Sequence, residues 1–227
     1  MFEREINLIG EDNYLKLKNS NILVIGVGGV GGYAVETLIR SGIENITLVD
    51  YDNIDISNIN RQVIALSSNI GNSKVEEFKK RILSINSNVK VKIIKEKINE
   101  DNIDLLFEED YDYIIDACDT MIVKKLLIKM CHKKHINLIT VCGMVKKLDP
   151  TKVKISDIRD TNYDPLAKAL RKYVKDEKFR DKVICISSTE EPIKTNKTMV
   201  TSMMMVPSTA GIYAASYVIN SIIKENK

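Results

Sequence analysis

Five glycines crowd one short stretch of the chain, directly after an apolar run at residues 22–25. They are Gly26, Gly28, Gly29, Gly31 and Gly32. A nucleotide phosphate can reach backbone N–H groups at the start of a helix only where no Cβ intervenes, and the helix dipole there favours an anion. The stretch therefore predicts a strand, a phosphate-binding turn and a helix, although a tight turn without a ligand can carry the same glycines.

Asp50 ends a second apolar run and lies 24 residues after Gly26. A carboxylate at the carboxyl end of the second strand can accept hydrogen bonds from ribose hydroxyls. The spacing predicts a nucleotide site at the carboxyl ends of parallel strands. Which nucleotide binds is still open on this evidence.

Three further charged residues follow predicted strands or turns. Arg61 and Lys74 flank a turn-rich segment, and Asp119 comes just after an apolar strand. Two cations and a carboxylate at one sheet edge suit phosphate and Mg²⁺ chemistry. This set favours ATP over a redox dinucleotide, and the doubled glycines then provide room for a triphosphate. His132 and His135, with lysine neighbours, are predicted at the surface, which weakens a hydride-transfer hypothesis.

Alternating strand and helix patterns must position these residues. Strands are expected at 89–94, 111–117 and 137–142, and helices at 74–85, 101–107 and 120–134. This order is typical of an α/β fold, a Rossmann-like, mostly parallel sheet with helices on both faces. Strands at 152–158 and 183–187, a helix at 167–175 and an apolar helix at 208–223 should extend the sheet. One domain over 1–227 is predicted, with the nucleotide-binding part at about 20–145 and an extension at about 150–227.

Composition sets the remaining bounds. A hydrophobic content of 44% and a net charge of +3 suit a soluble globular protein and do not require a polyanionic partner. The N-terminal stretch lacks an apolar signal core, which predicts a cytoplasmic protein.

Residues 1–20 are expected to pack as a short amphipathic segment through Ile6, Leu8, Ile9 and Leu15. Polar residues interrupt 199–223, so it is interpreted as buried core and not as a membrane span.

Several separated motifs carry a family resemblance. The stretches GVGGVGGYAVETLIRSGIENITLVDYDNIDISNINRQ, GNSKVEE and YDYIIDACDT resemble the adenylating domain of the superfamily that contains ThiF, MoeB and the ubiquitin-activating enzymes. The whole chain is more narrowly similar to the tRNA threonylcarbamoyladenosine dehydratase family. That similarity rests on DACDTMIVKKLLI, KKLDPTKVKISDIRDTNYDPLAKALRK, SSTEEP and MVPSTAGIYAASYVI.

The resemblance implies roles for individual residues. Gly28 and its neighbours would approach the ATP phosphates, and Asp50 would bind the ribose. Asp119 would coordinate Mg²⁺, and Arg4 would reach the ATP of the partner subunit in a homodimer. The residues implied to contact phosphates are Asn58, Arg61 and Lys74.

The implied reaction is adenylation of the threonine-derived carboxylate of threonylcarbamoyladenosine in tRNA. The carbamoyl group of the modification then captures the acyl adenylate, closes a ring and releases AMP. An internal nucleophile has a high effective molarity, so the enzyme needs no nucleophile of its own. The family also implies a monovalent cation, Na⁺ or K⁺, near residues 187–190, and a sulfur-transfer partner protein is a further expectation.

Two other functions compete with this one. The first is adenylation of a small sulfur-carrier protein, but such relatives typically carry two Cys-x-x-Cys pairs for zinc and this chain has none. The second is a non-catalytic nucleotide-binding subunit, which would have no need for Arg61, Lys74 and Asp119 together. A sulfur-relay role for a cysteine stays open beside the simpler prediction of buried thiols for Cys118, Cys131, Cys142 and Cys185.

A tRNA substrate would need a basic surface. The segment around 167–182 is charge-rich and is either a solvated helix face or a surface that binds tRNA phosphates. The residues assigned to that surface are Lys168, Arg171, Lys172, Lys175, Lys178, Arg180 and Lys182.

Overall fold

A seven-stranded sheet forms the centre of the computed structural model, which describes residues 1–194 and 201–224. Its order is β3-β2-β1-β4-β5-β7-β6, and only β6 pairs in the antiparallel direction. The strands are β1 (Asn21–Ile25), β2 (Asn45–Val49), β3 (Lys90–Ile94), β4 (Tyr113–Asp116), β5 (Asn137–Val141), β6 (Val153–Asp157) and β7 (Ile184–Ser188). The prediction of a mostly parallel sheet extended by C-terminal strands is confirmed.

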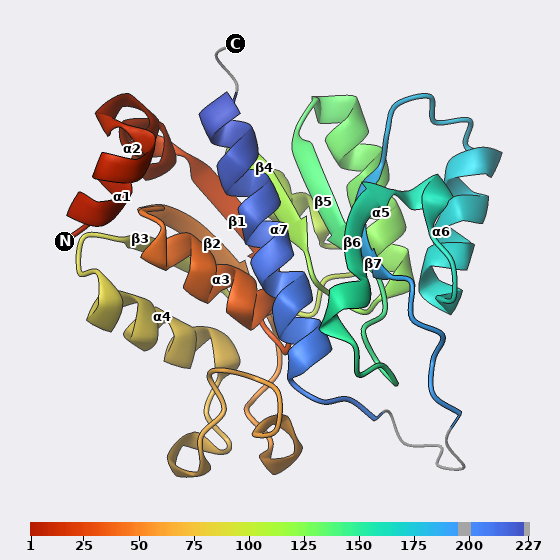
Figure 1. The fold of residues 1–227 in the computed structure, drawn as a ribbon, viewed down its shortest axis with the longest axis horizontal. Coiled ribbons are helices and arrows are strands. Elements are labelled where there is room, and N and C mark those ends of the chain that lie inside the picture. Colours follow the sequence, from red (N-terminus) through yellow and green to blue (C-terminus); the bar gives the residue numbers. More distant parts are fainter. Residues whose placement is uncertain (195–200, 225–227) are drawn as a thin grey trace.

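Helices cover both faces of this sheet (Figure 1). They are α1 (Glu3–Ile9), α2 (Glu11–Asn19), α3 (Gly31–Arg40), α4 (Lys74–Ile85), α5 (Met121–Lys134), α6 (Pro165–Asp176) and α7 (Met205–Lys224). Along β1, Ile22 and Val24 face the core beneath α3, α4 and α7, whereas Leu23 and Ile25 face the core beneath α5. This alternation is what a strand with two covered faces requires.

The apolar C-terminal segment is one helix, α7, packed against α3. Val206, Ala210, Ala214 and Val218 are fully buried along it. A Cβ on Gly211 would clash with the carbonyl oxygen of Val30, so the glycine permits this close approach. None of the helices among residues 1–194 and 201–224 has the length and apolar character to span a membrane. The interpretation of this segment as core is confirmed for α7 from Val206 onward, whereas Met203, Met204 and Met205 are exposed; Met199 and Val200 lie outside the described residues.

Two local predictions are wrong. Residues 101–107 form only a short 3₁₀ helix, Ile103–Phe107, because Asn99 and Asn102 side chains bond nearby backbone groups and compete with an α-helix. In the N-terminal segment, Leu8 is 83% exposed and Leu15 45% exposed, so neither packs as expected. By contrast, α4 begins at Lys74 and ends at Ile85, as the helical spacing predicts.

Candidate nucleotide-binding active site

A cavity of about 390 Å³ opens at the carboxyl ends of β1, β2, β4 and β5. Eight of the residues predicted for the site line this one cavity, although they come from segments far apart in the chain. These residues are Gly26, Gly28, Gly29, Asp50, Asn58, Arg61, Lys74 and Asp119.

The glycine turn joins β1 to α3, and its glycines have two different tasks. Gly26 has φ +80°, which favours glycine, and a Cβ there would lie 2.9 Å from the carbonyl oxygen of Ala117. Gly28 and Gly29 line the cavity. Gly31 does not line the cavity. A Cβ on Gly31 would lie against the carbonyl oxygen of Gly26. The second glycine pair, predicted to give room to phosphates, instead permits close packing at the start of α3.

Asp50 connects the end of β2 to this glycine turn. Its Oδ2 accepts a hydrogen bond from the Val27 amide at 2.9 Å, and its Oδ1 accepts one from the Asp52 amide at 2.9 Å. The carboxylate is half-buried at the cavity wall. Asp50 therefore fixes the turn and still presents oxygen to a bound ligand.

Three cationic residues line the cavity: Arg61 comes from the loop after β2, Lys74 begins α4, and Lys97 follows β3. Lys74, the first residue of α4, is buried, and its Nζ lies 2.8 Å from Oδ2 of Asp52. Arg61 donates to the Ser57 carbonyl at 2.7 Å and to Oδ1 of Asn60 at 2.9 Å, so its guanidinium is held at the cavity. Asn58 is buried and accepts from the Asp55 amide, which stabilises the short 3₁₀ turn Ile56–Asn58.

Asp119 is exposed at the start of the segment that leads into α5. Asp119 and Tyr51 both line the cavity. The pKa of Tyr51 is raised, first by Asp52, then by burial, and further by Asp119 and Asp50. Four carboxylate residues, Asp50, Asp52, Glu96 and Asp119, thus line the same cavity as Arg61 and Lys74.

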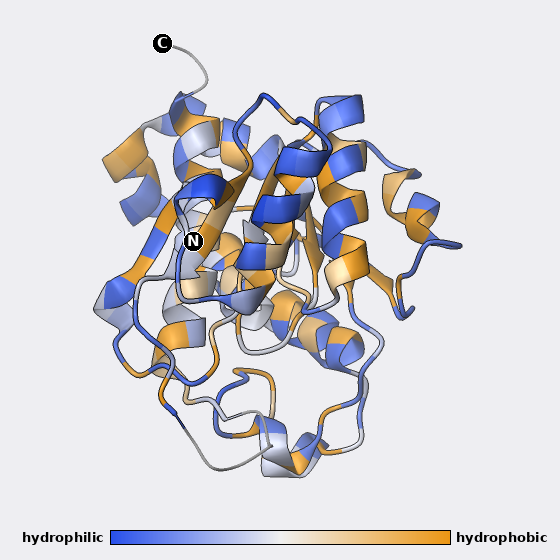
Figure 2. Cartoon of the chain, turned by 90° about the vertical axis from the view of Figure 1, so that its right-hand side faces the viewer, coloured by the Kyte–Doolittle hydropathy of each residue, from blue (hydrophilic) through white to orange (hydrophobic). Residues whose placement is uncertain are grey.

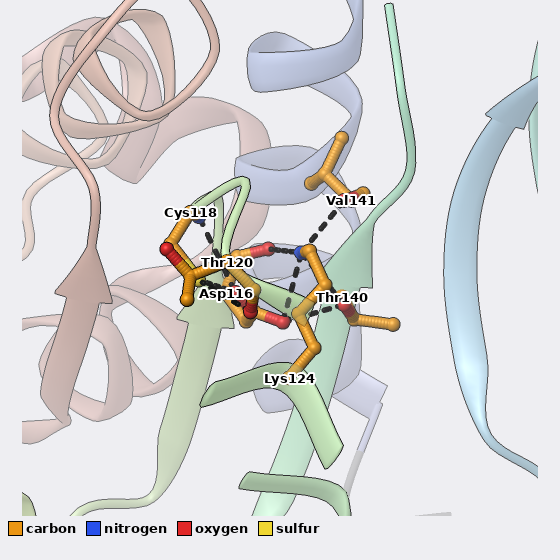
Figure 3. Close-up of polar contacts among 6 residues, drawn as sticks. All are labelled: Asp116, Cys118, Thr120, Lys124, Thr140 and Val141. Atoms are coloured by element: carbon orange, nitrogen blue, oxygen red, sulfur yellow. Dashed lines mark hydrogen bonds and ion pairs between the residues drawn. The ribbon is translucent and has the colours of Figure 1, made fainter. Parts of the chain in front are cut away.

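A buried polar network beneath Asp119 was not anticipated from the sequence (Figure 3). Lys124 is fully buried, and its Nζ lies 3.0 Å from Oδ2 of Asp116, 3.1 Å from Oγ1 of Thr140 and 2.8 Å from the Val141 carbonyl oxygen. Burial opposes the charge of Lys124, but the attraction of Asp116 leaves its pKa raised. The signal that could have revealed the network is a lysine placed between apolar residues in the sequence MIVKKLL.

Gln62 is a second residue that the sequence did not single out. It is 8% exposed and lines the cavity, and a Cβ on Gly28 would lie 3.5 Å from its Nε2. Its Oε1 is buried without a hydrogen-bond partner among the described residues. An acceptor left without a partner is costly, so a ligand or water that donates to it would gain stability.

The four thiols are unpaired cysteines, and Cys131, Cys142 and Cys185 are buried. Cys118 lines the cavity and donates from Sγ to Oδ1 of Asp116 at 3.0 Å. Burial and then the Asp116 charge raise the pKa of the Cys118 thiol far above its ordinary value. A thiol held protonated is a poor nucleophile, so this geometry gives no support to sulfur relay.

Arg4 and the predicted monovalent-cation site near residues 187–190 lie away from the cavity. Arg4 is exposed on α1 and borders a hollow beside Arg40 and Arg81. Near residues 187–190, the Ser188 carbonyl oxygen accepts from the buried ammonium of Lys147 at 3.1 Å. Glu190 accepts from the backbone amides of Leu148 and Asp149.

Comparisons with known proteins place the chain among relatives of known fold. The chain is 38% identical to a tRNA threonylcarbamoyladenosine dehydratase of Bacillus subtilis, over 99% of this chain and 95% of that protein. It superposes on the crystal structure of E. coli tRNA N6-threonylcarbamoyladenosine dehydratase, TcdA, in complex with AMP, with TM-score 0.93 and 33% identity over 99% and 94% of the two chains. The complex of the same E. coli protein with ATP gives TM-score 0.92, with the same identity and coverage. The ThiF family model matches residues 2–226, and the chain belongs to the ThiF family.

Proposed function

We propose that this protein is an enzyme that uses ATP to dehydrate threonylcarbamoyladenosine in tRNA. The observation that carries the proposal is the single cavity that gathers the glycine turn, Asp50, Arg61, Lys74 and Asp119. The dehydratase names of the Bacillus and E. coli relatives, and the ATP and AMP bound to the E. coli protein, support it. We treat residues 1–227 as one adenylating domain, since β6 and β7 belong to the same sheet as β1.

The residues of the cavity suit carboxyl adenylation. Backbone N–H groups of the glycine turn would face the phosphates, and Asp50 would accept from the ribose. Asn58 would also contact phosphate, and Arg61 and Lys74 would neutralise the charge that develops on the phosphate oxygens. The substrate carboxylate attacks the α-phosphorus and pyrophosphate leaves. The carbamoyl group of the same nucleoside then attacks the acyl carbon, and AMP departs with one carboxylate oxygen.

Magnesium fits the mouth of this cavity. Mg²⁺ usually binds through one or two carboxylates together with substrate phosphates, and exposed Asp119 provides such a carboxylate in the cavity that Asp50 and Asp52 also line. Bound there by Asp119, the metal would neutralise phosphate charge during the displacement. A monovalent cation, Na⁺ or K⁺, near residues 187–190 stays a prediction; the Ser188 carbonyl oxygen accepts from the Lys147 ammonium and keeps a second lone pair.

A homodimer would explain the position of Arg4. This side chain is exposed on α1 and does not line the cavity of its own chain, which is consistent with a role at a neighbouring subunit's ATP. Exposed apolar side chains lie near the cavity residues Asn58, Arg61 and Ser202 in sequence, and Asn60 joins the two segments by donating to the Ser202 carbonyl. They offer a subunit interface and comprise Ile56, Ile59, Met203, Met204 and Met205.

The outer face of α6 is the proposed tRNA-binding surface. Its residues Lys168, Lys172 and Lys175 are exposed, and Figure 2, seen from the α6 side of Figure 1, shows hydrophilic residues on the outer helices. The N-terminal turns of α5 and α6 reach the cavity through Thr120, Val123 and Leu166. Exposed Lys178, Arg180 and Lys182 continue the surface, but Arg171 is half-buried and donates to Thr161.

A cytoplasmic location accompanies this proposal, since its substrate is tRNA. A sulfur-transfer partner is not required by it, because the acyl adenylate is captured within the substrate.

Incubation with ATP, Mg²⁺ and tRNA carrying threonylcarbamoyladenosine, followed by mass spectrometry of the nucleosides, tests the function. Loss of one water from the modified nucleoside supports it. An unchanged nucleoside, with AMP formed only after a sulfur-carrier protein is added, would assign the chain to carrier-protein adenylation.

A further inference from the structure

The ammonium group of Lys124 joins three parts of the cavity wall. It contacts Asp116 at the end of β4, and Thr140 and Val141 at the end of β5 (Figure 3). Its own backbone belongs to the first turn of α5, where the Lys124 amide donates to the Thr120 carbonyl at 3.1 Å. The segments after β4 and β5, and Val123 in the first turn of α5, line the cavity. One side chain therefore fixes the relative positions of two strand ends and a helix start.

Residues 117–120 lie between these fixed points and carry Asp119. Asp116 precedes the segment and binds its first turn, since Oδ1 accepts from the Cys118 amide at 3.3 Å and from the Cys118 thiol at 3.0 Å. Ala117 packs against the glycine turn, where a Cβ on Gly26 would lie 2.9 Å from its carbonyl oxygen. A shift of Asp116 would therefore displace the segment that presents Asp119.

The second carboxylate oxygen of Asp116, Oδ2, is also hydrogen-bonded. Oδ2 of Asp116 accepts from Oγ1 of Thr140 at 2.6 Å as well as from Lys124. All three side chains are fully buried, so water cannot replace a lost partner. Each polar atom has a partner in one arrangement of the strand ends, which specifies that arrangement.

We infer that Lys124 is a positioning residue, which holds Asp119 at the cavity mouth for the magnesium–nucleotide complex through Asp116 and the 117–120 segment. The inference rests on the proposed function for the role of Asp119. Lys124 itself does not line the cavity, so its effect is indirect.

Backbone amide exchange in the protein without nucleotide tests the inference. Lys124→Met alone would leave a buried carboxylate unpaired, so the primary variant is Asp116→Asn with Lys124→Met, which removes both charges. Exchange at residues 117–120 should accelerate about tenfold, while exchange at residues 74–94, on the other side of the sheet, stays as in the wild type. Lys125→Met is the matched control, because Lys125 is next in sequence but extends over the Tyr173 ring.

ATP binding gives a second readout. The ratio of the Kd for ATP in EDTA to the Kd in Mg²⁺ should fall about fivefold in the double variant and remain unchanged in Lys125→Met. If the double variant does not fold, Thr140→Val keeps both charges and should change both readouts in the same direction by about twofold.

Wild-type exchange at 117–120, or a wild-type Mg²⁺ ratio, in a folded variant would overturn the inference. Neither readout requires tRNA. Failure of the wild-type protein to dehydrate modified tRNA would therefore refute the proposed function. It would not change the amide-exchange rates or the ratio of ATP Kd values by which the role of Lys124 is judged.

Discussion

Lys74 and Asp52 form an ion pair at the cavity mouth, with 2.8 Å between Nζ and Oδ2. The lysine side chain is 6% exposed and the aspartate side chain 46% exposed, so the cation is the more buried partner. A bound phosphate would therefore meet a lysine that is already desolvated and oriented, while Asp52 can turn to water.

Lys74→Met should weaken ATP binding about thirtyfold, because a charge-assisted contact of about 2 kcal/mol is lost. Isothermal titration calorimetry measures the change. Lys80→Met on the same helix is the control, since Lys80 is exposed and pairs with Glu77 at 2.6 Å. Equal ATP affinity in Lys74→Met and Lys80→Met would remove Lys74 from the phosphate site.

Asp50 should determine the preference for a ribose. The wild-type protein should bind ATP about tenfold more tightly than 2′,3′-dideoxy-ATP, because a carboxylate accepts from the hydroxyls. Asp50→Ala should bind the two nucleotides equally and should also unfold at lower temperature, since the Val27 and Asp52 amides lose their acceptor. A retained preference in Asp50→Ala would show that another group recognises the sugar.

Most of the site could be predicted because its residues follow recognisable strands and turns. The glycine turn and Asp50 are fixed by a local strand–helix–strand unit, and Brändén's rule brings Arg61, Lys74 and Asp119 to the same edge. The partners within the site could not be predicted. The pairing of Lys74 with Asp52, and of Lys124 with Asp116, depends on side-chain directions that strand and helix patterns do not specify.

The burial of single side chains could not always be predicted from the apolar pattern of the sequence. Apolar spacing predicted packing for Leu8, yet α1 contains no buried residue. Sequence pattern identifies an amphipathic face but not whether a partner within the same chain covers it. Conversely, Lys124 is fully buried although lysine is rarely buried without a partner, and it was not singled out from the sequence.

Buried thiols should make the stability fall in alkaline solution. Burial raises the pKa of Cys131 from its ordinary value of 9.0 to about 12. Because the folded pKa is the higher one, the stabilisation is fully present below about pH 9 and is lost as the pH rises toward 12. Cys131→Ala should reduce the slope of unfolding free energy between pH 9.5 and 11 by about 1.4 kcal/mol per pH unit, measured by urea denaturation. Parallel curves for the two proteins would place the Cys131 thiol in contact with solvent.

The basic surface on α6 should control tRNA affinity. Lys168→Glu combined with Lys172→Glu should weaken tRNA binding at least tenfold and reduce the slope of log K against log salt by about 2, while ATP affinity is unchanged. The control combines Lys80→Glu with Lys90→Glu, which are exposed on α4 and β3 at the other end of the sheet. Equal tRNA affinity in the two double variants would move the binding surface elsewhere.

Oxygen tracing tests the central claim, the carboxyl adenylate, most directly. Threonylcarbamoyladenosine in tRNA is labelled with ¹⁸O in its carboxylate and incubated with the protein, ATP and Mg²⁺. The proposed reaction transfers one labelled oxygen to AMP, produces pyrophosphate in equal amount and leaves a nucleoside lighter by one water. Asp119→Ala should give none of these products. Unlabelled AMP beside a dehydrated nucleoside, or ADP in place of AMP, would contradict carboxyl adenylation.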